Sequence, residues 1–259
     1  MKMSSLICSL TIVQKKLKII FLMLIKKAVD VMSYTYVASD VHGNGDAYYD
    51  LKAILNSDDR LYIIGDVLDR DDDGIEILQD IMSDSRITLI MGNHESLLNM
   101  GAFRELHAAG SPDEVEEIIS ANLAIEQIGQ EQTLRDFAEL SKGEQGEIIE
   151  FLNNLPLYEE LTVNGKNYIL VHGGLPDFSG LPVDYYEESE LLFGPHNFDE
   201  QHYEDTTVIV GHLPTRFIHG AEPDCIFRCG DSIAIDCGCG MQGGRLGVIC
   251  LDTDEEFYF

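Results

Sequence analysis

The sequence is poor in basic residues. Its 259 residues include 17 Lys and Arg against 46 Asp and Glu, and the formal net charge is −29. Residues 32–259 hold 11 Lys and Arg against 45 Asp and Glu. Binding to a nucleic-acid backbone requires clustered Lys and Arg, so the shortage argues against a nucleic acid as partner. It also predicts that a phosphorylated ligand is repelled at long range, until cations close to the binding site attract it.

Long hydrophobic runs are also missing. The apolar run Ile19–Ile25 has seven residues, whereas a membrane-spanning helix needs about 20. No small-residue cleavage site follows it, as a secretory signal would require. We therefore expect no membrane partner and a cytoplasmic location, in which the six cysteines stay reduced. Residues 1–31 differ in charge from the rest, and we expect them to be an extension upstream of Met32 that lies outside the fold.

Linkers rich in Pro, Gly or Ser are absent, and no internal repeat divides the chain. Residues 32–259 are therefore expected to form one domain, since this length suits a single large α/β unit. Within it, a segment of about 97–156 has helical character. Two capping-box patterns, Ser111–Glu114 and Ser141–Glu144, mark helix starts there. We expect this helical insert to form a cap that shapes substrate choice.

The cysteines Cys225, Cys229, Cys237 and Cys239 are close together in the sequence. Their spacing is not that of a standard zinc site, and Cys237 follows an apolar, strand-like run that begins at Ser232. Buried free thiols are therefore favoured over a zinc site.

Five short apolar runs each end next to a residue that can bind a metal. Such runs are typical of buried strands, and ligands of α/β sheets bind outside the carboxyl ends of the strands. The adjoining glycines allow sharp turns and close approach. The runs and their residues are Tyr34–Ala38 with Asp40 and His42, Leu61–Ile64 with Asp66, Ile87–Met91 with Asn93, Tyr168–Val171 with His172, and Val208–Val210 with His212. We expect these six side chains to meet at one rim.

Such a set suits the hydrolysis of phosphate esters by two metal ions, which together activate water and neutralise the phosphoryl charge. Mixed oxygen and imidazole ligands favour Mn, Fe or Zn over Ca or Mg. A carboxylate is needed to bridge two cations that repel each other. The reaction also calls for a general acid such as His, a carboxylate that orients it, and an Arg that grips the phosphate.

The motifs resemble a known superfamily. Asp40-x-His42, Gly65-Asp66-x-x-Asp69-Arg70, Gly92-Asn93-His94-Glu95, His172-Gly173 and Gly211-His212 are similar to the signature of calcineurin-like metallophosphoesterases. The Gly-Asp-x-x-Asp-Arg form, with Gly-Asn-His-Glu complete, is typical of the phosphoprotein phosphatase branch, the serine/threonine phosphatases. The C-terminal stretch, with Ile235-Asp-Cys-Gly, Gly243-Gly-Arg-Leu and Leu251-Asp-Thr, resembles bacterial and phage members of this superfamily. The resemblance extends from about Tyr34 to the C-terminus and implies an α/β fold of two packed mixed β-sheets, a β-sandwich flanked by helices.

The resemblance also implies roles for individual residues. Asp40 and His42 would hold a first metal, Asp66 would bridge, and Asn93, His172 and His212 would complete the second site. Two metal ions, Mn²⁺ or Fe with Zn²⁺ as an alternative, are the implied cofactors. His94 would be the general acid, Asp69 would orient it, and Arg70 would bind the phosphate.

Three departures from the family pattern concern the substrate side. Asp71–Asp73 replaces a usual glycine and should weaken anion binding unless the acids point outward. The segment Glu190–His196 lacks the second phosphate-binding Arg of many relatives, and His196 is expected to substitute in part when protonated. Leu213 stands where Thr is common.

The leading hypothesis is a metal-dependent phosphatase in which a metal-bridged hydroxide attacks phosphate monoesters, with phosphoserine or phosphothreonine in proteins, or a small phosphoester, as substrate. An alternative on the same site is symmetrical hydrolysis of a dinucleotide polyphosphate, although that polyanion calls for more basic residues than the chain offers. A third is a metal-binding regulatory module with weakened catalysis, which the missing Arg favours and the presence of His94 and Asp69 disfavours.

Overall fold

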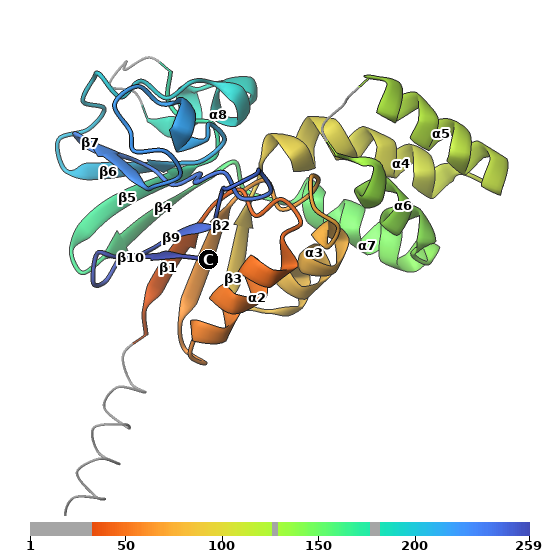
Figure 1. The fold of residues 1–259 in the computed structure, drawn as a ribbon, viewed down its shortest axis with the longest axis horizontal. Coiled ribbons are helices and arrows are strands. Elements are labelled where there is room, and N and C mark those ends of the chain that lie inside the picture. Colours follow the sequence, from red (N-terminus) through yellow and green to blue (C-terminus); the bar gives the residue numbers. More distant parts are fainter. Residues whose placement is uncertain (1–32, 126–128, 177–181) are drawn as a thin grey trace, which may run out of the picture.

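The computed structural model describes residues 33–125, 129–176 and 182–259. The extension expected at residues 1–31 lies outside these ranges. In Figure 1 two sheets lie together, and a group of helices, α4 to α7, projects from them to one side.

The first sheet has the order β10-β9-β1-β2-β3. Its parallel centre consists of β1 (Thr35–Ala38), β2 (Arg60–Ile64) and β3 (Ile87–Ile90). The strands β9 (Gly247–Cys250) and β10 (Glu255–Tyr258) extend it in antiparallel fashion, with Tyr36 paired to Cys250. The C-terminal strands therefore complete the sheet that β1 begins.

The second sheet has the order β4-β5-β6-β8-β7. Here β5 (Lys166–Val171), β6 (Thr206–Val210) and β8 (Ser232–Ala234) are parallel, and β4 (Tyr158–Val163) and β7 (Phe227–Cys229) are antiparallel edges. Both sheets are thus mixed, as expected. Each has a parallel centre whose strands end at one common edge.

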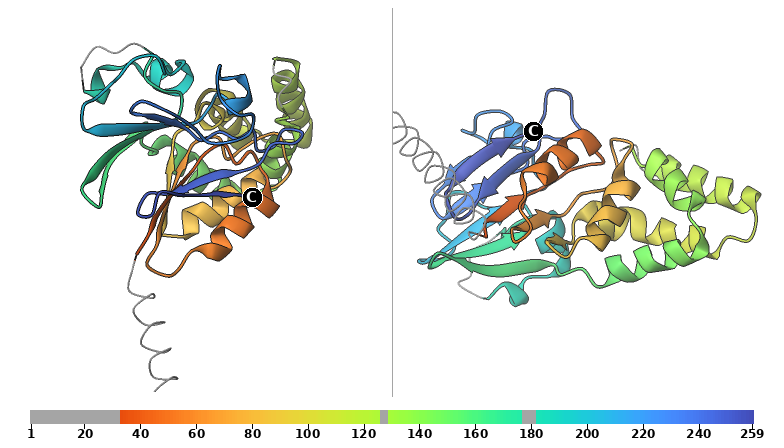
Figure 2. Two further views of the ribbon diagram at one scale, coloured as in Figure 1. Left: turned by 60° about the vertical axis from the view of Figure 1, so that its left-hand side comes forward. Right: turned by 90° about the horizontal axis from the view of Figure 1, so that it is seen from below.

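The two sheets lie against each other (Figure 2), and alternate residues of their strands form the core between them. Val37, Ile64 and Ile249 of the first sheet belong to one buried cluster with Leu170 and Ile209 of the second. The neighbours in sequence face outward and contact helices. Side chains of a strand alternate between its faces, so these continuous apolar runs are covered on both sides.

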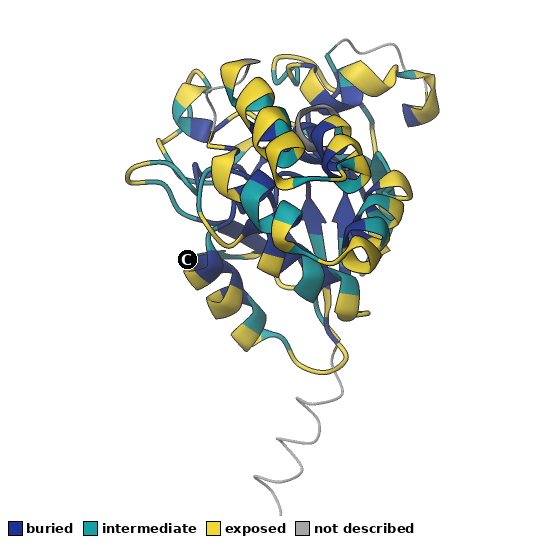
Figure 3. Cartoon of the chain, turned by 90° about the vertical axis from the view of Figure 1, so that its right-hand side faces the viewer, coloured by how far each residue is buried: buried dark blue, intermediate teal, exposed yellow. Residues whose placement is uncertain are grey.

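Helices cover the outer face of the first sheet. They are α2 (Gly45–Ile54) and α3 (Gly74–Ser83), and they share one core with the insert. On the second sheet lie α8 (Glu188–Phe193) and the short turns η2 (Val183–Tyr185) and η3 (Thr215–Phe217). Figure 3 shows exposed helix faces outside and buried strands within. This arrangement confirms the predicted α/β fold.

The segment expected to form the insert contains the π-helical turn η1 (His94–Asn99), α4 (Met100–Ala108), α5 (Pro112–Ile125), α6 (Glu131–Glu139) and α7 (Lys142–Asn153). Ser141 and Glu144 form the expected capping box on α7. At α5 the box is incomplete: Ser111 Oγ accepts from the Glu114 amide, but the Glu114 carboxylate accepts from Gly110 N at 2.7 Å. Glu114 therefore closes the turn one residue earlier.

The cysteines differ in burial. Cys237, Cys239 and Cys250 are buried, whereas Cys225 and Cys229 are only partly covered. All five are free thiols, and among the described residues none of them belongs to a candidate metal cluster. Within the same ranges, no helix has the length and apolar character needed to cross a bilayer.

Ile209→Ala should lower the free energy of unfolding by about 2–5 kcal/mol, because it leaves a cavity between the sheets. Ile209 is fully buried, whereas Ile54 is 37% exposed, so Ile54→Ala serves as the matched control. Urea unfolding measures both variants. Equal effects of the two substitutions would contradict the inter-sheet core.

Candidate metal centre

The predicted site residues lie in the loops that follow five parallel strands, β1, β2, β3, β5 and β6. The structure brings the loops of both sheets together, since Asn93 after β3 contacts His172 after β5 and His212 after β6. Seven of the nine predicted residues are buried, and Arg70 and His212 are partly exposed. The buried ones are Asp40, His42, Asp66, Asp69, Asn93, His94 and His172.

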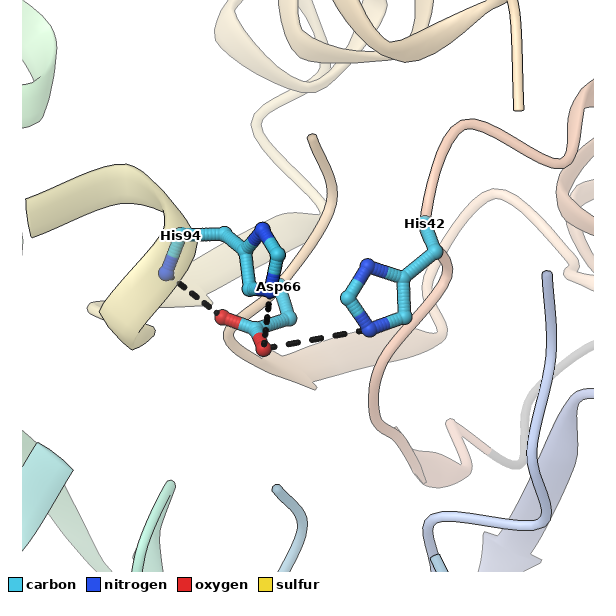
Figure 4. Close-up of side chains that lie close together, drawn as sticks. All are labelled: His42, Asp66 and His94. Atoms are coloured by element: carbon cyan, nitrogen blue, oxygen red, sulfur yellow. Dashed lines mark hydrogen bonds and ion pairs between the residues drawn. The ribbon is translucent and has the colours of Figure 1, made fainter. Parts of the chain in front are cut away.

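Asp66 occupies the centre of the site. Its Oδ2 lies 3.3 Å from Nε2 of His172, 3.8 Å from Nε2 of His42 and 3.9 Å from Nε2 of His94. Figure 4 shows this carboxylate between the His42 and His94 rings. Two groups share it, His42–Asp66–His94 and Asp66–His172–His212, and the ligand atoms within each group lie within 4.8 Å of one another. A shared carboxylate is what a bridged pair of cations needs.

Hydrogen bonds to the main chain orient two of the rings. Nδ1 of His42 donates to the Leu68 carbonyl at 3.1 Å, and Nδ1 of His172 donates to the Ile64 carbonyl at 2.9 Å. In both rings Nε2 is left facing the centre, which is the usual arrangement of a metal-binding histidine. The Asn93 Oδ1 atom lies 2.8 Å from both His172 Nε2 and His212 Nδ1.

On the side of the site formed by the loop after β1, two buried acceptor atoms, Asp40 Oδ1 and His42 Nε2, face each other. Asp40 Oδ1 and His42 Nε2 are 3.8 Å apart, and both residues are fully buried. Neither atom has a hydrogen-bond partner among the described residues. Two enclosed acceptors at this distance are unfavourable unless a cation lies close to both. The residues present therefore fit a metal ion.

The charges give the same indication. Burial raises the pKa of Asp40 to about 6 and lowers the pKa of His42 to about 3 and that of His212 to about 4. Burial also acts to raise the pKa of Asp66, but the charges of His172 and His94 outweigh it and hold this pKa well below its ordinary value. Burial lowers the pKa of His172, yet Asp66 more than compensates and raises it to about 10. Carboxylates crowded in a dry site require positive charge.

The backbone of the site is strained. Among the described non-glycine residues with positive φ, six are predicted site residues: Asp40, His42, Asp66, Asp69, Arg70 and His212, with φ between 49° and 74°. Such conformations cost about 1–3 kcal/mol each and persist where surrounding contacts hold them. Close packing also requires Gly211, since a Cβ there would lie 2.4 Å from Asp40 Oδ2.

Glu95, which sequence reasoning did not single out, holds the loop that carries Asp66. It is fully buried, and its carboxylate accepts hydrogen bonds from the main-chain N–H groups of Asp66, Val67, Leu68 and Gly92 at 2.8–3.2 Å. Burial and the charge of Asp66 raise its pKa to about 7. The signal was available, because Glu95 ends the Gly-Asn-His-Glu motif.

Asp236 is a second residue that sequence reasoning missed. It follows β8, the third parallel strand of its sheet, and is fully buried. Its Oδ1 accepts from Gly238 N at 2.8 Å, and its Oδ2 has no hydrogen-bond partner among the described residues. Burial and the charge of Asp40 raise its pKa well above the ordinary value. The sequence pattern was present here too, since Asp236 directly follows the apolar run that begins at Ser232.

His94 and Asp69 form a close pair. Nδ1 of His94 lies 2.6 Å from Asp69 Oδ2, and both side chains are buried. Burial acts to lower the pKa of His94, but the charge of Asp66 and the hydrogen bond to Asp69 outweigh it, so the pKa is raised. A protonated His94 beside the central carboxylate is equipped to donate a proton.

Arg70 and its acidic neighbours point in different directions. Nη1 of Arg70 is buried and has no hydrogen-bond partner among the described residues. Asp72 and Asp73 are exposed and, with Asp71, line a cavity of about 320 Å³ beside the start of α2. Asp72 and Asp73 therefore point outward, the condition under which they would not weaken anion binding, while Asp71 is half-buried.

The expected substitution of the second Arg by His196 is wrong. Nδ1 of His196 accepts from Leu175 N at 3.2 Å, so Nε2 donates to Ser232 Oγ at 2.7 Å. Burial lowers the pKa of His196 to about 3. The ring is neutral and both nitrogens are engaged, so it offers no positive charge to an anion. Leu213, beside His212, is 40% exposed.

The sequence profile of the calcineurin-like phosphoesterases matches residues 34–237. The chain therefore belongs to the calcineurin-like phosphoesterase family, as predicted, a family of metal-dependent phosphoester hydrolases.

One curated relative matches part of the chain. Over 94 residues the chain is 33% identical to the symmetrical bis(5'-nucleosyl)-tetraphosphatase of Proteus mirabilis (strain HI4320). That match covers 34% of this chain and 33% of the relative, so the chain spans about a third of the length of the curated relative it matches.

Solved structures agree in fold. A proposed diadenosine tetraphosphatase superposes with a TM-score of 0.61 at 17% identity, covering 88% of this chain and 94% of that one. A protein serine/threonine phosphatase from Saccharomyces cerevisiae superposes with a TM-score of 0.52 at 18% identity, covering 85% and 72%. At these identities the likeness concerns the fold alone.

Glu95→Gln should lower the free energy of unfolding by about 2–4 kcal/mol, since the new amide NH₂ would face two main-chain N–H donors and leave them unpaired. It should also weaken metal binding, because the Asp66 loop loses its support. Urea unfolding and metal titration measure the two effects. Glu114→Gln, where the exposed Glu114 accepts from Gly110 N, is the control. Unchanged stability and metal affinity would contradict the role of Glu95.

Proposed function

We propose that the protein is a phosphatase that uses two bound metal ions to hydrolyse phosphate monoesters, with phosphoserine or phosphothreonine in proteins as the substrate. The observation that carries the proposal is the His94–Asp69 pair, with 2.6 Å between Nδ1 and Oδ2. It lies beside the Asp66 carboxylate, whose Oδ2 is 3.8 Å from His42 Nε2 and which forms a candidate metal cluster with His172 and His212. A proton donor next to a candidate dinuclear site is the combination that ester cleavage requires.

In this proposal Asp40 and His42 would hold the first metal, Asn93, His172 and His212 would hold the second, and both sites would share Asp66. The 3.8 Å approach of Asp40 Oδ1 to His42 Nε2 and the contacts of Asn93 Oδ1 with two rings support the division. Imidazole and oxygen ligands favour Mn or Fe, with Zn as an alternative. When bound, the metal ions supply an activated water and neutralise the phosphoryl charge.

The remaining roles fall to three residues. His94 donates a proton to the leaving oxygen, and Asp69 orients the imidazole and stabilises its charge. Arg70 binds the phosphate oxygens through its guanidinium, whose buried Nη1 has no hydrogen-bond partner among the described residues. Because His196 is neutral, Arg70 binds the phosphate without its help.

A second candidate function is symmetrical cleavage of a dinucleotide tetraphosphate. The 33% identity with the Proteus mirabilis enzyme over 94 residues favours it. The acids near the site oppose it: Asp46, Asp72 and Asp73 line a cavity beside the start of α2. Although Asp72 and Asp73 point away from Arg70, their charge repels a substrate with several negative charges at long range. A monoester places one phosphate at the metals and brings less charge to this rim. A regulatory module that only binds metal is the third candidate, favoured by the neutral His196.

Asp66→Asn should abolish tight binding of both metals, because the neutral amide lacks the negative charge with which a carboxylate bridges two cations. The metal content per chain after dialysis, measured by plasma mass spectrometry, tests this. Asp46→Asn, an exposed carboxylate at the start of α2, is the control and should keep its metals. Two metals retained by Asp66→Asn would refute the assignment of the bridge.

His94→Asn should lower kcat on phosphoserine peptides by about 10²–10⁴-fold, the usual contribution of a positioned proton donor, while both metals stay bound. Turnover with and without Mn²⁺ and metal content are measured on the same preparations. The wild-type protein should also hydrolyse p-nitrophenyl phosphate in a metal-dependent way.

The same assay separates the candidate functions. A higher kcat/KM for the dinucleotide tetraphosphate than for phosphoserine peptides would favour the second candidate. Two bound metals per chain with no turnover on any of these substrates would favour the binding module.

A further inference from the structure

The helical insert contacts the site at the loop that carries Asp69 and Arg70. The Asp69 N–H donates to Thr133 Oγ1 at 3.1 Å, and the Arg70 N–H donates to the Gly129 carbonyl at 3.2 Å. Thr133 lies in the first turn of α6, and Gly129 lies just before that helix. Both acceptors are more than 50 residues away from their donors in the sequence.

The two residues that donate these hydrogen bonds, Asp69 and Arg70, have strained backbone conformations. Asp69 and Arg70 are consecutive and have φ of 69° and 74°, a conformation that residues other than glycine avoid. The loop with Asp40 and His42 is held differently: their N–H groups donate to the Gly65 and Asp66 carbonyls at the start of the loop after β2. The insert therefore supports the residues proposed to orient His94 and to bind the phosphate, whereas the start of the loop after β2 supports Asp40 and His42.

The junction has little room. A Cβ on Gly129, whose φ is 78°, would lie 2.8 Å from the Arg70 Cα. Thr133 is 2% exposed and Asp69 is fully buried. Displacement of α6 would thus move the backbone of Asp69 and Arg70.

A closed chain of contacts links the insert to His94. His94 begins η1, which continues into α4. On α4, Phe103 stacks on Phe137 of α6 with ring centroids 3.9 Å apart. Phe137 is one helical turn from Thr133. Thr133 holds Asp69, and Asp69 in turn contacts His94.

We propose that the insert is a positioning device for proton donation: Thr133 holds Asp69, and Gly129 holds Arg70, in the conformation that aligns them with His94 and the phosphate. The inference rests on the proposed function for its catalytic consequence. Its geometric content, that Thr133 aligns the Asp69–His94 pair, is independent of turnover.

The kinetic test uses Thr133→Val, which keeps the shape and removes the acceptor, and Thr133→Ser, which restores it. Ser141→Ala removes the capping box of α7 and so weakens the same insert without touching the loop. For the serine phosphate ester, whose poor leaving group needs a proton, Thr133→Val should lower kcat about tenfold, equal to about 1.4 kcal/mol. For p-nitrophenyl phosphate, whose leaving group needs little help, kcat should fall much less.

Metal content should stay at the wild-type level, Thr133→Ser should recover the serine-ester rate, and Ser141→Ala should affect both substrates alike. Gly129→Ala should reproduce the effect of Thr133→Val and also raise KM, because it displaces Arg70. Equal losses on both substrates in Thr133→Val, or no loss, would overturn the inference while leaving the phosphatase proposal intact.

A measurement without turnover separates the two proposals. The His94 Nδ1 proton, held at the 2.6 Å contact with Asp69, should give a slowly exchanging, downfield proton resonance in the wild type. Thr133→Val should lose or shift it, and Thr133→Ser should retain it. The same resonance in wild type and Thr133→Val would refute the positioning role even if the protein showed no phosphatase activity.

Discussion

The structure depends on one constraint, the crowding of carboxylates in the dry space between the ends of two sheets. Asp40, Asp66, Asp69, Glu95 and Asp236 are all buried there. Asp66 touches loops of both sheets, through His42 and His94 on one side and His172 on the other. Such a set is tolerable when positive charge, N–H donors or metal ions compensate it. The loops of the two sheets therefore meet at the residues that are expected to carry out the chemistry.

The loops place these side chains together by adopting strained backbone conformations, which contacts from other parts of the fold stabilise. Six site residues adopt positive φ. Glu95 holds the loop after β2 through the main-chain N–H groups of Asp66, Val67 and Leu68, and the loop after β3 through that of Gly92. The helical insert holds the next two residues of the loop after β2, Asp69 and Arg70. The supports come from separate segments but act on one loop, and Asp66 Oδ1 in turn accepts from the His94 N–H at 3.0 Å. The metal ligands and the groups expected to act on the substrate therefore share part of their scaffold.

Much of the site could be predicted because its residues obey a local rule, in which a buried parallel strand ends and a ligand follows. The rule located Asp40, His42, Asp66, Asn93, His172 and His212 within loops that the structure does bring together. It applied to Asp236 too, but the cysteines beside that residue drew the interpretation elsewhere. The prediction that His196 replaces the second Arg was wrong because the hydrogen-bond partners of its ring, Leu175 and Ser232, are distant in the sequence. A neutral, buried ring cannot be told from an exposed, charged one without them.

By itself the sequence determined the fold class, the order of the ligand loops and the family, because these follow from hydrophobic period and from short motifs. Tertiary structure decided the rest. It showed which carboxylates are buried together, which histidine nitrogens face inward, and that Thr133 reaches Asp69. The physical reason is range: strand and helix patterns are local, whereas burial and long-range hydrogen bonds arise only when distant segments pack.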